Sequence, residues 1–284
     1  MLASTVETAQ PALLLVAPGL QVFTVKGYKG NMALLTPLPI RQISYQEFSM
    51  LKIAQSRCFK GILGMLLMSA AIMLQAADPA PLKVLFIGNS HTMVNDVPEL
   101  FARLAKQSGI QVEKRMIAEG GKTLEYHAGT EVVKDSILHG DYDWIVLQHW
   151  AHPFNETYAK SMENGAEQLF EMIGKTKSKA VFYKPWPRMS TAPGEYPMMS
   201  ETYARLAKQY HAGLANVGDV FEKYRALYPG ETMYATDGEH ASPLTSNIAA
   251  YVILRTIMEK KPVCVSAEEK KIEAACDAFL SGTK

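Results

Sequence analysis

The chain of 284 residues carries 29 basic and 28 acidic residues, a formal net charge of +1, and 48% of its residues are hydrophobic. This balance excludes an intrinsically disordered chain, which needs low hydrophobicity and high net charge, and a strongly basic nucleic-acid-binding protein. Residues 78–284 alone hold 23 basic and 26 acidic residues, a net charge of −3, so we expect a mildly acidic globular body without a nucleic-acid partner.

Residues 50–77 have the order of a secretory signal. A basic stretch at 52–60 precedes an uncharged apolar run at 61–75, which ends near Ala76 and Ala77. Because a membrane-spanning helix needs about 20 apolar residues and this run is shorter, we predict a cleaved signal and export to the periplasm or the extracellular space. An uncleaved membrane anchor is the alternative. After cleavage we expect no stable membrane insertion.

Residues 1–49 precede that signal and show no clear hydrophobic period. Secretory signals normally begin at the initiator Met, and Met50 is the natural alternative start. We therefore interpret residues 1–49 as a mis-annotated upstream extension and expect it to be disordered. The predicted organisation is this extension, the signal peptide at 50–77 and one globular domain at 78–284.

From Pro81 onward, short β-rich apolar runs alternate with longer amphipathic patterns. The predicted strands cover residues 83–88, 111–117, 143–148, 180–184 and 213–217. The predicted helices cover residues 97–109, 155–175, 201–212, 242–260 and 266–280. Strands that alternate with helices of this length predict parallel βαβ units. The predicted fold class is α/β, a three-layer α/β/α sandwich with a mainly parallel five-stranded sheet.

Cysteine and histidine spacing restricts the chemistry of the domain. Cys264 and Cys276 remain after signal cleavage, and an oxidising compartment would allow them to pair, a question that the sequence leaves open. His149 and His152 lie three residues apart without a second ligand pair, so we predict no metal site. We interpret both histidines as loop residues.

The loop after the first predicted strand is the first candidate for chemistry. In an open parallel sheet, reactive groups lie in the loops at the carboxyl ends of the strands. Gly88-Asn89-Ser90 follows that strand, and Ser90 lies near a helix N-terminus, where backbone amides favour an anion. A nucleophilic serine needs this setting because its attack creates an oxyanion near its own amide. On this loop alone, a helix N-cap is the alternative.

A second segment supplies a candidate base. Asp237 and His240 lie three residues apart in a turn-rich stretch just before the last long helix. One short loop can therefore present an imidazole and the carboxylate that orients it. A capping Asp beside a surface His is the alternative for this pair taken alone.

Together the two segments resemble the SGNH (GDSL-like) hydrolase superfamily over roughly residues 82–260. Gly88-Asn89-Ser90 matches its first block, and Asp237-Gly238-Glu239-His240 matches its last block. The resemblance implies an SGNH/flavodoxin-like fold with Ser90 as nucleophile, His240 as general base and Asp237 as its orienting residue. It requires no cofactor.

The same resemblance indicates an oxyanion hole. The amides of Ser90 and Gly121 are expected to contribute, with Gly120 as the alternative glycine after the second strand. The Asn of the superfamily's third block is absent, and Gln148 stands at that strand end, as in a branch with Gln in place of Asn. Gln148 is therefore expected to offer its side-chain NH2 to the oxyanion.

Aromatic and polar residues near the same loops are candidates for substrate binding. Trp150 and Trp186 follow the third and fourth strands and suit a sugar ring or an apolar acyl group, with ordinary packing as the alternative. Asn89 and His91 flank the nucleophile and complete the set. Lys184 after the fourth strand is interpreted as a solvated surface charge, with binding of an acidic substrate as the alternative.

These features predict an exported serine esterase that hydrolyses ester bonds by means of a Ser-His-Asp triad. By analogy, O-acetyl groups on carbohydrates are the expected substrate. A lipase or thioesterase of the same fold, and a catalytically inactive SGNH-like carbohydrate-binding module, are the alternatives. A flavodoxin-like phosphate-binding protein leaves Asp237 and His240 without a role. The expected partner is a small-molecule or carbohydrate ester.

Overall fold

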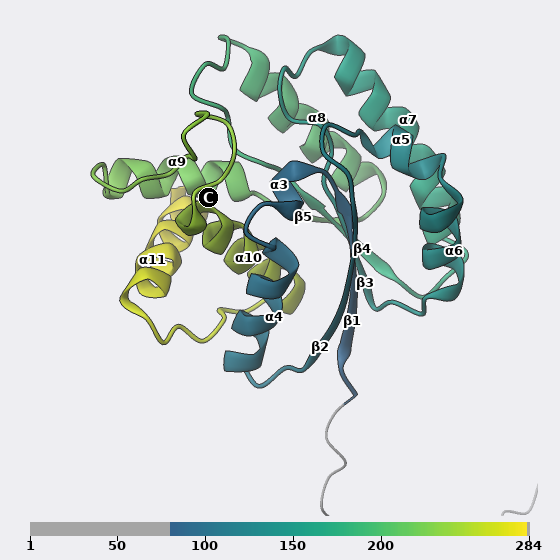
Figure 1. Ribbon diagram of the computed structural model, residues 1–284, viewed down its shortest axis with the longest axis horizontal. Helices are drawn as coiled ribbons and strands as arrows, with labels where there is room; N and C mark the ends of the chain where they lie inside the picture. Colours follow the sequence, from purple (N-terminus) through teal and green to yellow (C-terminus); the bar gives the residue numbers. More distant parts are fainter. Residues whose placement is uncertain (1–79, 283–284) are drawn as a thin grey trace, which may run out of the picture. The chain divides into compact units, whose positions relative to one another are not determined.

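The computed structural model describes residues 80–282, which contain a five-stranded sheet in the order β2-β1-β3-β4-β5 with every neighbouring pair parallel (Figure 1). The strands are β1 Leu82–Gly88, β2 Val112–Ala118, β3 Trp144–Leu147, β4 Lys179–Tyr183 and β5 Gly213–Ala215. Each strand begins within one residue of its predicted start. Parallel strands need crossover connections, and helices supply them here.

Helices cover both faces of the sheet, as Figure 1 shows. On one face lie α3 Ser90–Met93, α4 Val97–Gln107, α9 Val217–Leu227, α10 Pro243–Met258 and α11 Ala267–Gly282. On the other lie α5 Leu124–Ala128, α6 Glu131–His139, α7 Glu156–Ile173 and α8 Glu195–Gln209. The predicted three-layer α/β/α fold is confirmed, and its sheet is entirely parallel.

The alternation of side chains along β1 divides the core into two parts. Val84 and Phe86 pack with α4, α9, α10 and α11, whereas Leu85 and Ile87 pack with α5, α6, α7 and α8. All four side chains are fully buried, because both faces of a parallel sheet are covered. This is why the strand reads as a continuous apolar run.

The predicted starts of α4, α7, α10 and α11 lie within one residue of the observed starts. The Asn155 side chain accepts hydrogen bonds from the amides of Thr157 and Tyr158 at the start of α7. Ser242 caps α10 in the same way. By contrast, α8 begins at Glu195 and not near residue 201, and the prediction did not include α5 and α6. These short helices carry few periodic positions, so their pattern is weak.

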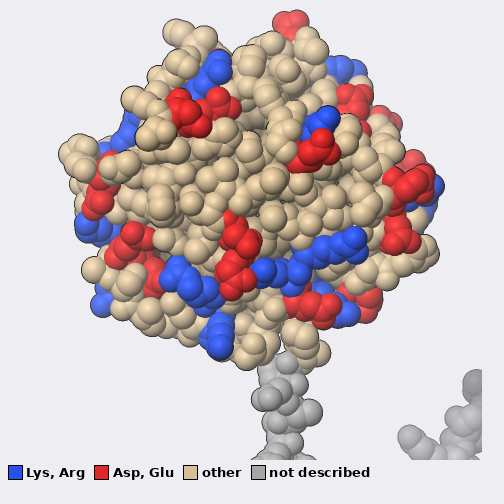
Figure 2. Space-filling model, in the orientation of Figure 1, with Lys and Arg blue, Asp and Glu red and all other residues tan. Residues whose placement is uncertain are grey.

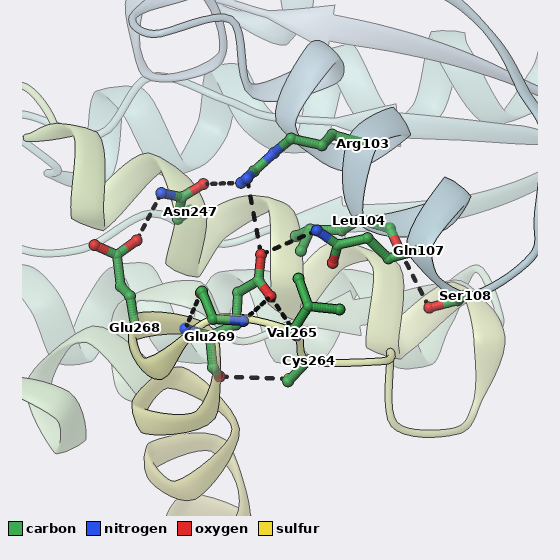
Figure 3. Close-up of polar contacts among 10 residues, drawn as sticks. Arg103, Leu104, Gln107, Ser108, Asn247, Cys264, Val265, Glu268 and Glu269 are labelled. Atoms are coloured by element: carbon green, nitrogen blue, oxygen red, sulfur yellow. Dashed lines mark hydrogen bonds and ion pairs between the residues drawn. The ribbon is translucent and has the colours of Figure 1, made fainter.

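A buried carboxylate fixes the start of α11 against α4 (Figure 3). Glu269 accepts hydrogen bonds from the amides of Val265 and Ser266, at 2.8 and 3.1 Å, and from Gln107 Nε2 at 3.3 Å. Burial by itself would raise the pKa of Glu269, but these bonds and the nearby Arg103 charge lower it. The paired carboxylate therefore joins helices that are distant in sequence.

The structure bears unevenly on the predictions about the N-terminal region, membrane insertion and the cysteines. The proposed extension at 1–49 and signal at 50–77 lie outside the described residues. Within residues 80–282, no helix combines the length and hydropathy needed to cross a bilayer. Cys264 and Cys276 are free thiols, and burial raises the pKa of each to about 11.

The surface charges fit a globular body of low net charge. On the face shown in Figure 2, acidic and basic side chains are intermixed around a largely uncharged centre, and no broad area of a single sign is visible.

Candidate active site

The turn that leaves β1 places Ser90 at a helix start. Ser90 is the first residue of α3, and the Asn89 side chain caps the helix by accepting a hydrogen bond from the His91 amide at 3.1 Å. The first amides of a helix have no acceptor within the helix. The Ser90 N–H is therefore free to face an anion, and its side chain is partly exposed.

Buried side chains from other elements hold this turn. His127 on α5 lies with Nε2 at 2.7 Å from the Gly88 carbonyl, and the Tyr183 hydroxyl at the end of β4 donates to the His91 carbonyl at 3.1 Å. Because a carbonyl can only accept, His127 Nε2 carries the proton. Burial lowers the pKa of His127. The sequence did not identify His127 as a supporting residue, since a lone His on a short helix carries no distinctive signal.

Asp237 and His240 form a hydrogen-bonded pair in the loop before α10. His240 Nδ1 lies 2.6 Å from Asp237 Oδ2, while Asp237 Oδ1 accepts from the amides of Glu239 and His240, each at 2.9 Å. These bonds, led by that from the Glu239 amide, lower the pKa of Asp237 to about 2. The carboxylate is thus ionised at neutral pH. With the proton on Nδ1, the other ring nitrogen, Nε2, is the basic one.

The tertiary fold brings the Ser90 turn and this loop together. Asn95, just after α3, donates from Nδ2 to the Ala241 carbonyl at 3.3 Å and to Ser246 Oγ at 3.0 Å. His91 follows the predicted nucleophile and His240 is the predicted base. The centroids of their rings lie 5.7 Å apart. The residues following the serine therefore lie against the residues that follow the base.

Asn95 adopts a conformation that suits this contact. Its φ is +58°, in the left-handed region, and Asp96 follows with φ +52°. Asn and Asp tolerate this region better than other residues that have a Cβ. The reversal of the chain between α3 and α4 lets the Asn95 amide reach the loop before α10.

The β4–α8 connection supports the Asp-His loop from its other side. Trp186 Nε1 donates to the Glu239 carbonyl at 2.9 Å, and the Met189 amide donates to the Gly238 carbonyl at 2.9 Å. Trp186 is fully buried. The structure therefore corrects the expected direct substrate contact of Trp186, since its ring packs beneath the loop and positions it.

Gly121 lies in the loop after β2, beside the serine turn. Its φ is +74°, which favours glycine, whereas Gly120 has no such conformation. Asn89 Nδ2 donates to the neighbouring Lys122 carbonyl at 3.1 Å and joins the two loops. Asn89 is only 1% exposed, so it too holds the loops together and is not open to substrate.

Gln148 lies behind the serine turn, with no part of its side chain exposed. Its Oε1 accepts from the Asn89 amide at 2.9 Å and from Thr92 Oγ1 at 3.0 Å. Its Nε2 donates to the His149 carbonyl. Gln148 was expected to donate its NH2 group to the oxyanion, but both the oxygen and the nitrogen of its side-chain amide form hydrogen bonds within the protein.

His149 and His152 lie in the loop after β3, as predicted, but their side chains are buried, as is that of His91. His91, His149 and His152 are 3%, 0% and 3% exposed. Burial lowers the pKa of His91 and of His149 to about 3 and also lowers that of His152. These imidazoles are therefore neutral near pH 7. His152 lies between the Trp186 carbonyl and Glu195, at 2.9 and 3.4 Å.

Of the four predicted substrate-binding residues, Trp150 is the one with a partly exposed side chain. Its ring stacks on Tyr158 with centroids 5.4 Å apart and an interplanar angle of 21°. A Cβ built on Gly121 would lie 3.5 Å from the Trp150 ring. The aromatic pair therefore borders the Gly121 loop.

Lys184 also differs from the expectation of a solvated charge. Its side chain is 4% exposed, and Nζ lies 2.6 Å from Asp219 Oδ2 and 3.1 Å from Ser200 Oγ. Tyr196 donates to the same carboxylate at 2.9 Å. This buried network connects the end of β4 with α8 and α9. The Lys184 charge is therefore paired with groups of the protein itself.

Two further features bear on where chemistry occurs. Within residues 80–282, no group of three or more His, Cys, Asp or Glu side chains is arranged to hold a metal ion. A cavity of about 950 Å³ lies at the amino-terminal ends of β3, β4 and β5, lined in part by Trp144, Phe170 and Tyr210. It is at the opposite end of the strands from Ser90 and His240.

Comparison with known proteins places the fold among hydrolases. No family model and no curated protein matches the chain. Among solved structures, it is similar to a protein from Slackia heliotrinireducens assigned to the SGNH hydrolases, at 26% identity and a TM-score of 0.51, covering 62% of this chain and 99% of that one.

Two more distant structures share the fold. A DUF4886 family protein from Bacteroides uniformis has 16% identity and a TM-score of 0.59 over 72% of this chain and 96% of that one. A protein from Parabacteroides merdae assigned to the GDSL-like lipases has 13% identity and a TM-score of 0.51 over 63% and 96%. The predicted resemblance to the SGNH hydrolases is confirmed, and with it the expectation of a hydrolytic enzyme.

Proposed function

Starting from the SGNH (GDSL-like) hydrolase fold of this chain, we propose that it is an exported serine esterase that removes O-acetyl groups from carbohydrates. The observation that carries the proposal is the 2.6 Å pair of His240 and Asp237, which the fold sets against the segment following Ser90. A base oriented by a carboxylate, close to a serine at a helix N-terminus, is the arrangement that activates a hydroxyl for acyl transfer.

In the proposed reaction, Ser90 Oγ attacks the ester carbonyl while His240 Nε2 accepts its proton. The carbonyl oxygen becomes an oxyanion, which the amides of Ser90 and Gly121 stabilise. The tetrahedral intermediate then breaks the bond to the alcohol, which leaves with the proton from His240. Water, deprotonated by His240, then attacks the acyl-serine. The second tetrahedral intermediate breaks its bond to Ser90 Oγ, which takes back the proton from His240, and the carboxylic acid is released.

Asp237 acts on His240 and not on the substrate. Its carboxylate keeps the proton on Nδ1 and stabilises the imidazolium that forms during each proton transfer. The hydrogen bonds that lower the pKa of Asp237 to about 2 keep this carboxylate charged at neutral pH.

The carbohydrate preference is supported by the Trp150–Tyr158 pair beside Gly121. Flat aromatic surfaces next to the reacting group suit the apolar face of a sugar ring. Export is part of the proposal because residues 50–77 have the composition of a signal and extracellular carbohydrate esters would then be accessible.

The test is hydrolysis of p-nitrophenyl acetate, p-nitrophenyl butyrate and acetylated xylan by the wild-type chain and by Ser90→Ala and His240→Ala. We expect turnover of acetate by the wild type and a loss of roughly 10³-fold or more in kcat for each variant. His139→Ala, at an exposed position on α6, is the matched control and should be as active as the wild type.

Other outcomes would redirect the assignment. A preference for long-chain or thioester substrates, with the same losses in the variants, would indicate a lipase or thioesterase. If the folded wild type hydrolyses none of the esters and a fluorophosphonate does not label Ser90, the esterase proposal fails. Binding of xylan without hydrolysis would then favour the carbohydrate-binding module.

A further inference from the structure

The side-chain amide of Gln148 has a fixed orientation at the back of the serine turn. The Asn89 backbone N–H, 2.9 Å away, can only donate, so the atom facing it must be Oε1. Nε2 then points the other way and donates to the His149 carbonyl. Thr92 Oγ1 occupies a second site on Oε1 at 3.0 Å. The oxygen, and not the NH2 group, faces the turn.

The turn is packed directly onto this amide. A Cβ built on Gly88 would lie 2.7 Å from Gln148 Oε1 and 2.4 Å from Thr92 Oγ1, so the absence of a side chain at Gly88 allows the close approach. Asn89 and Thr92 are each 1% exposed. The residues on both sides of Ser90 therefore wrap around Gln148, while Ser90 itself remains partly exposed.

From this geometry we propose that Gln148 is a positioning residue: its Oε1 holds the Gly88–Thr92 turn so that the Ser90 amide and hydroxyl face the substrate, and it does not itself donate to the oxyanion. The oxyanion hole is then built from the backbone amides of Ser90 and Gly121. This inference rests on the proposed esterase function and specifies how the Gln found in place of the superfamily's Asn serves that site.

The physical reason is that the Gln148 side chain has no access to the substrate and that the Ser90 groups must be aligned accurately. An oxyanion donor must come within 2.7–3.1 Å of the substrate oxygen, whereas the Gln148 side chain is 0% exposed and reaches the site only through Asn89 and Thr92. A small displacement of the Ser90 amide and hydroxyl would misalign both attack and oxyanion stabilisation. Such a displacement lowers kcat more than it changes KM, because the groups act in the transition state.

The first experiment examines the wild-type chain after reaction with a fluorophosphonate, whose phosphonyl oxygen mimics the oxyanion. A crystal structure of the adduct should place that oxygen within hydrogen-bond distance of the Ser90 and Gly121 amides, with Gln148 Nε2 still bonded to the His149 carbonyl. Movement of Nε2 into hydrogen-bond distance of the phosphonyl oxygen would overturn the proposal and support the direct role expected from the sequence.

The second experiment compares Gln148→Met, which keeps the length of the side chain but removes its polar atoms, with the milder Thr92→Val, which removes one bond to Oε1. We expect kcat for p-nitrophenyl acetate to fall roughly 10- to 100-fold in Gln148→Met and by a smaller factor in Thr92→Val, with KM nearly unchanged. Gln168→Met, at an exposed position on α7, is the control.

Hydrogen exchange separates this inference from the esterase proposal. Amides in residues 88–93 should exchange faster in both variants than in the wild type or the control, whatever the substrate proves to be. Unchanged exchange together with a kcat near the wild-type value would contradict the positioning role. Ser90→Ala tests the serine mechanism alone, so its retention of activity would refute the esterase proposal and leave the exchange result to decide the role of Gln148.

Discussion

At the scale of single residues, the candidate site depends on which group carries each proton. Asp237 Oδ1 is held by two backbone amides, and Oδ2 is left for the His240 ring. The carboxylate is half exposed, with 50% of its side-chain surface accessible. Its main effect is therefore on the state of the imidazole, since exposed ion pairs contribute little to folding stability.

Asp237→Asn should reduce kcat by roughly 10²- to 10⁴-fold with little change in folding stability. The amide oxygen can still accept from the Glu239 and His240 amides, but its NH2 group would face Nδ1. The imidazole must then carry its proton on Nε2 and cannot take one from Ser90. Steady-state kinetics on p-nitrophenyl acetate and urea unfolding would measure the two effects; an unaltered kcat would contradict the assigned role of Asp237.

At the scale of elements, close approach of helices decides where small residues are required. Gly165 lies on α7 where it crosses α5, and a Cβ there would be 2.4 Å from the Glu125 amide nitrogen and 2.6 Å from the Leu124 carbonyl carbon. Both are backbone atoms and cannot move aside as a side chain can. This contact fixes α5, and with it His127 on the Gly88 carbonyl.

Gly165→Ala should destabilise the fold by about 1–3 kcal/mol through overpacking. Alanine is favoured over glycine in a helix by about 1 kcal/mol, but the clash with backbone outweighs that gain. Equilibrium urea unfolding would measure the difference. Gly230→Ala is the matched control, because a Cβ at Gly230 meets nothing within 4 Å; an equal or higher stability of Gly165→Ala would show that α5 and α7 adjust at no cost.

At the scale of the whole molecule, buried neutral histidines couple stability to pH. His149 is fully buried, its Nδ1 accepts from the Leu124 amide at 3.1 Å, and burial lowers its pKa from the ordinary 6.5 to about 3. Between these two values the unfolded chain binds a proton that the folded protein does not. The free energy of unfolding therefore rises with pH across this window. The contribution of His149 decreases as the pH falls from 6.5 toward 3.

His149→Gln should reduce this dependence. Each histidine of this kind contributes a limiting slope of about 1.4 kcal/mol per pH unit, so the variant should lose less stability than the wild type between about pH 6 and pH 4. Glutamine retains an oxygen that can accept from Leu124. Urea unfolding over this range is the measurement, with the exposed His139→Gln as control; the same slope in wild type and His149→Gln would disprove the coupling.

The fold was predictable from local patterns, and local patterns also indicated the residues of the candidate site. Buried parallel strands appear in the sequence as short apolar runs, so their positions could be predicted. The caps formed by Asn155 and Ser242 are also local, because each side chain accepts from backbone amides two or three residues along the chain. The Gly-Asn-Ser and Asp-x-x-His segments indicated a serine, a base and an orienting carboxylate. The pair formed by Asp237 and His240 is itself local, because three residues separate them.

Contacts between distant segments could be decided only by the tertiary structure. Burial of His91, Trp186 and Lys184 depends on which elements pack over them, and the same residue types are common on solvated loops. The direction of the Gln148 amide and the supporting bond of His127 depend on loops far apart in sequence. Sequence patterns thus determined the elements and the residue types of the candidate site, whereas packing determined which polar groups remain exposed and which form hydrogen bonds within the protein.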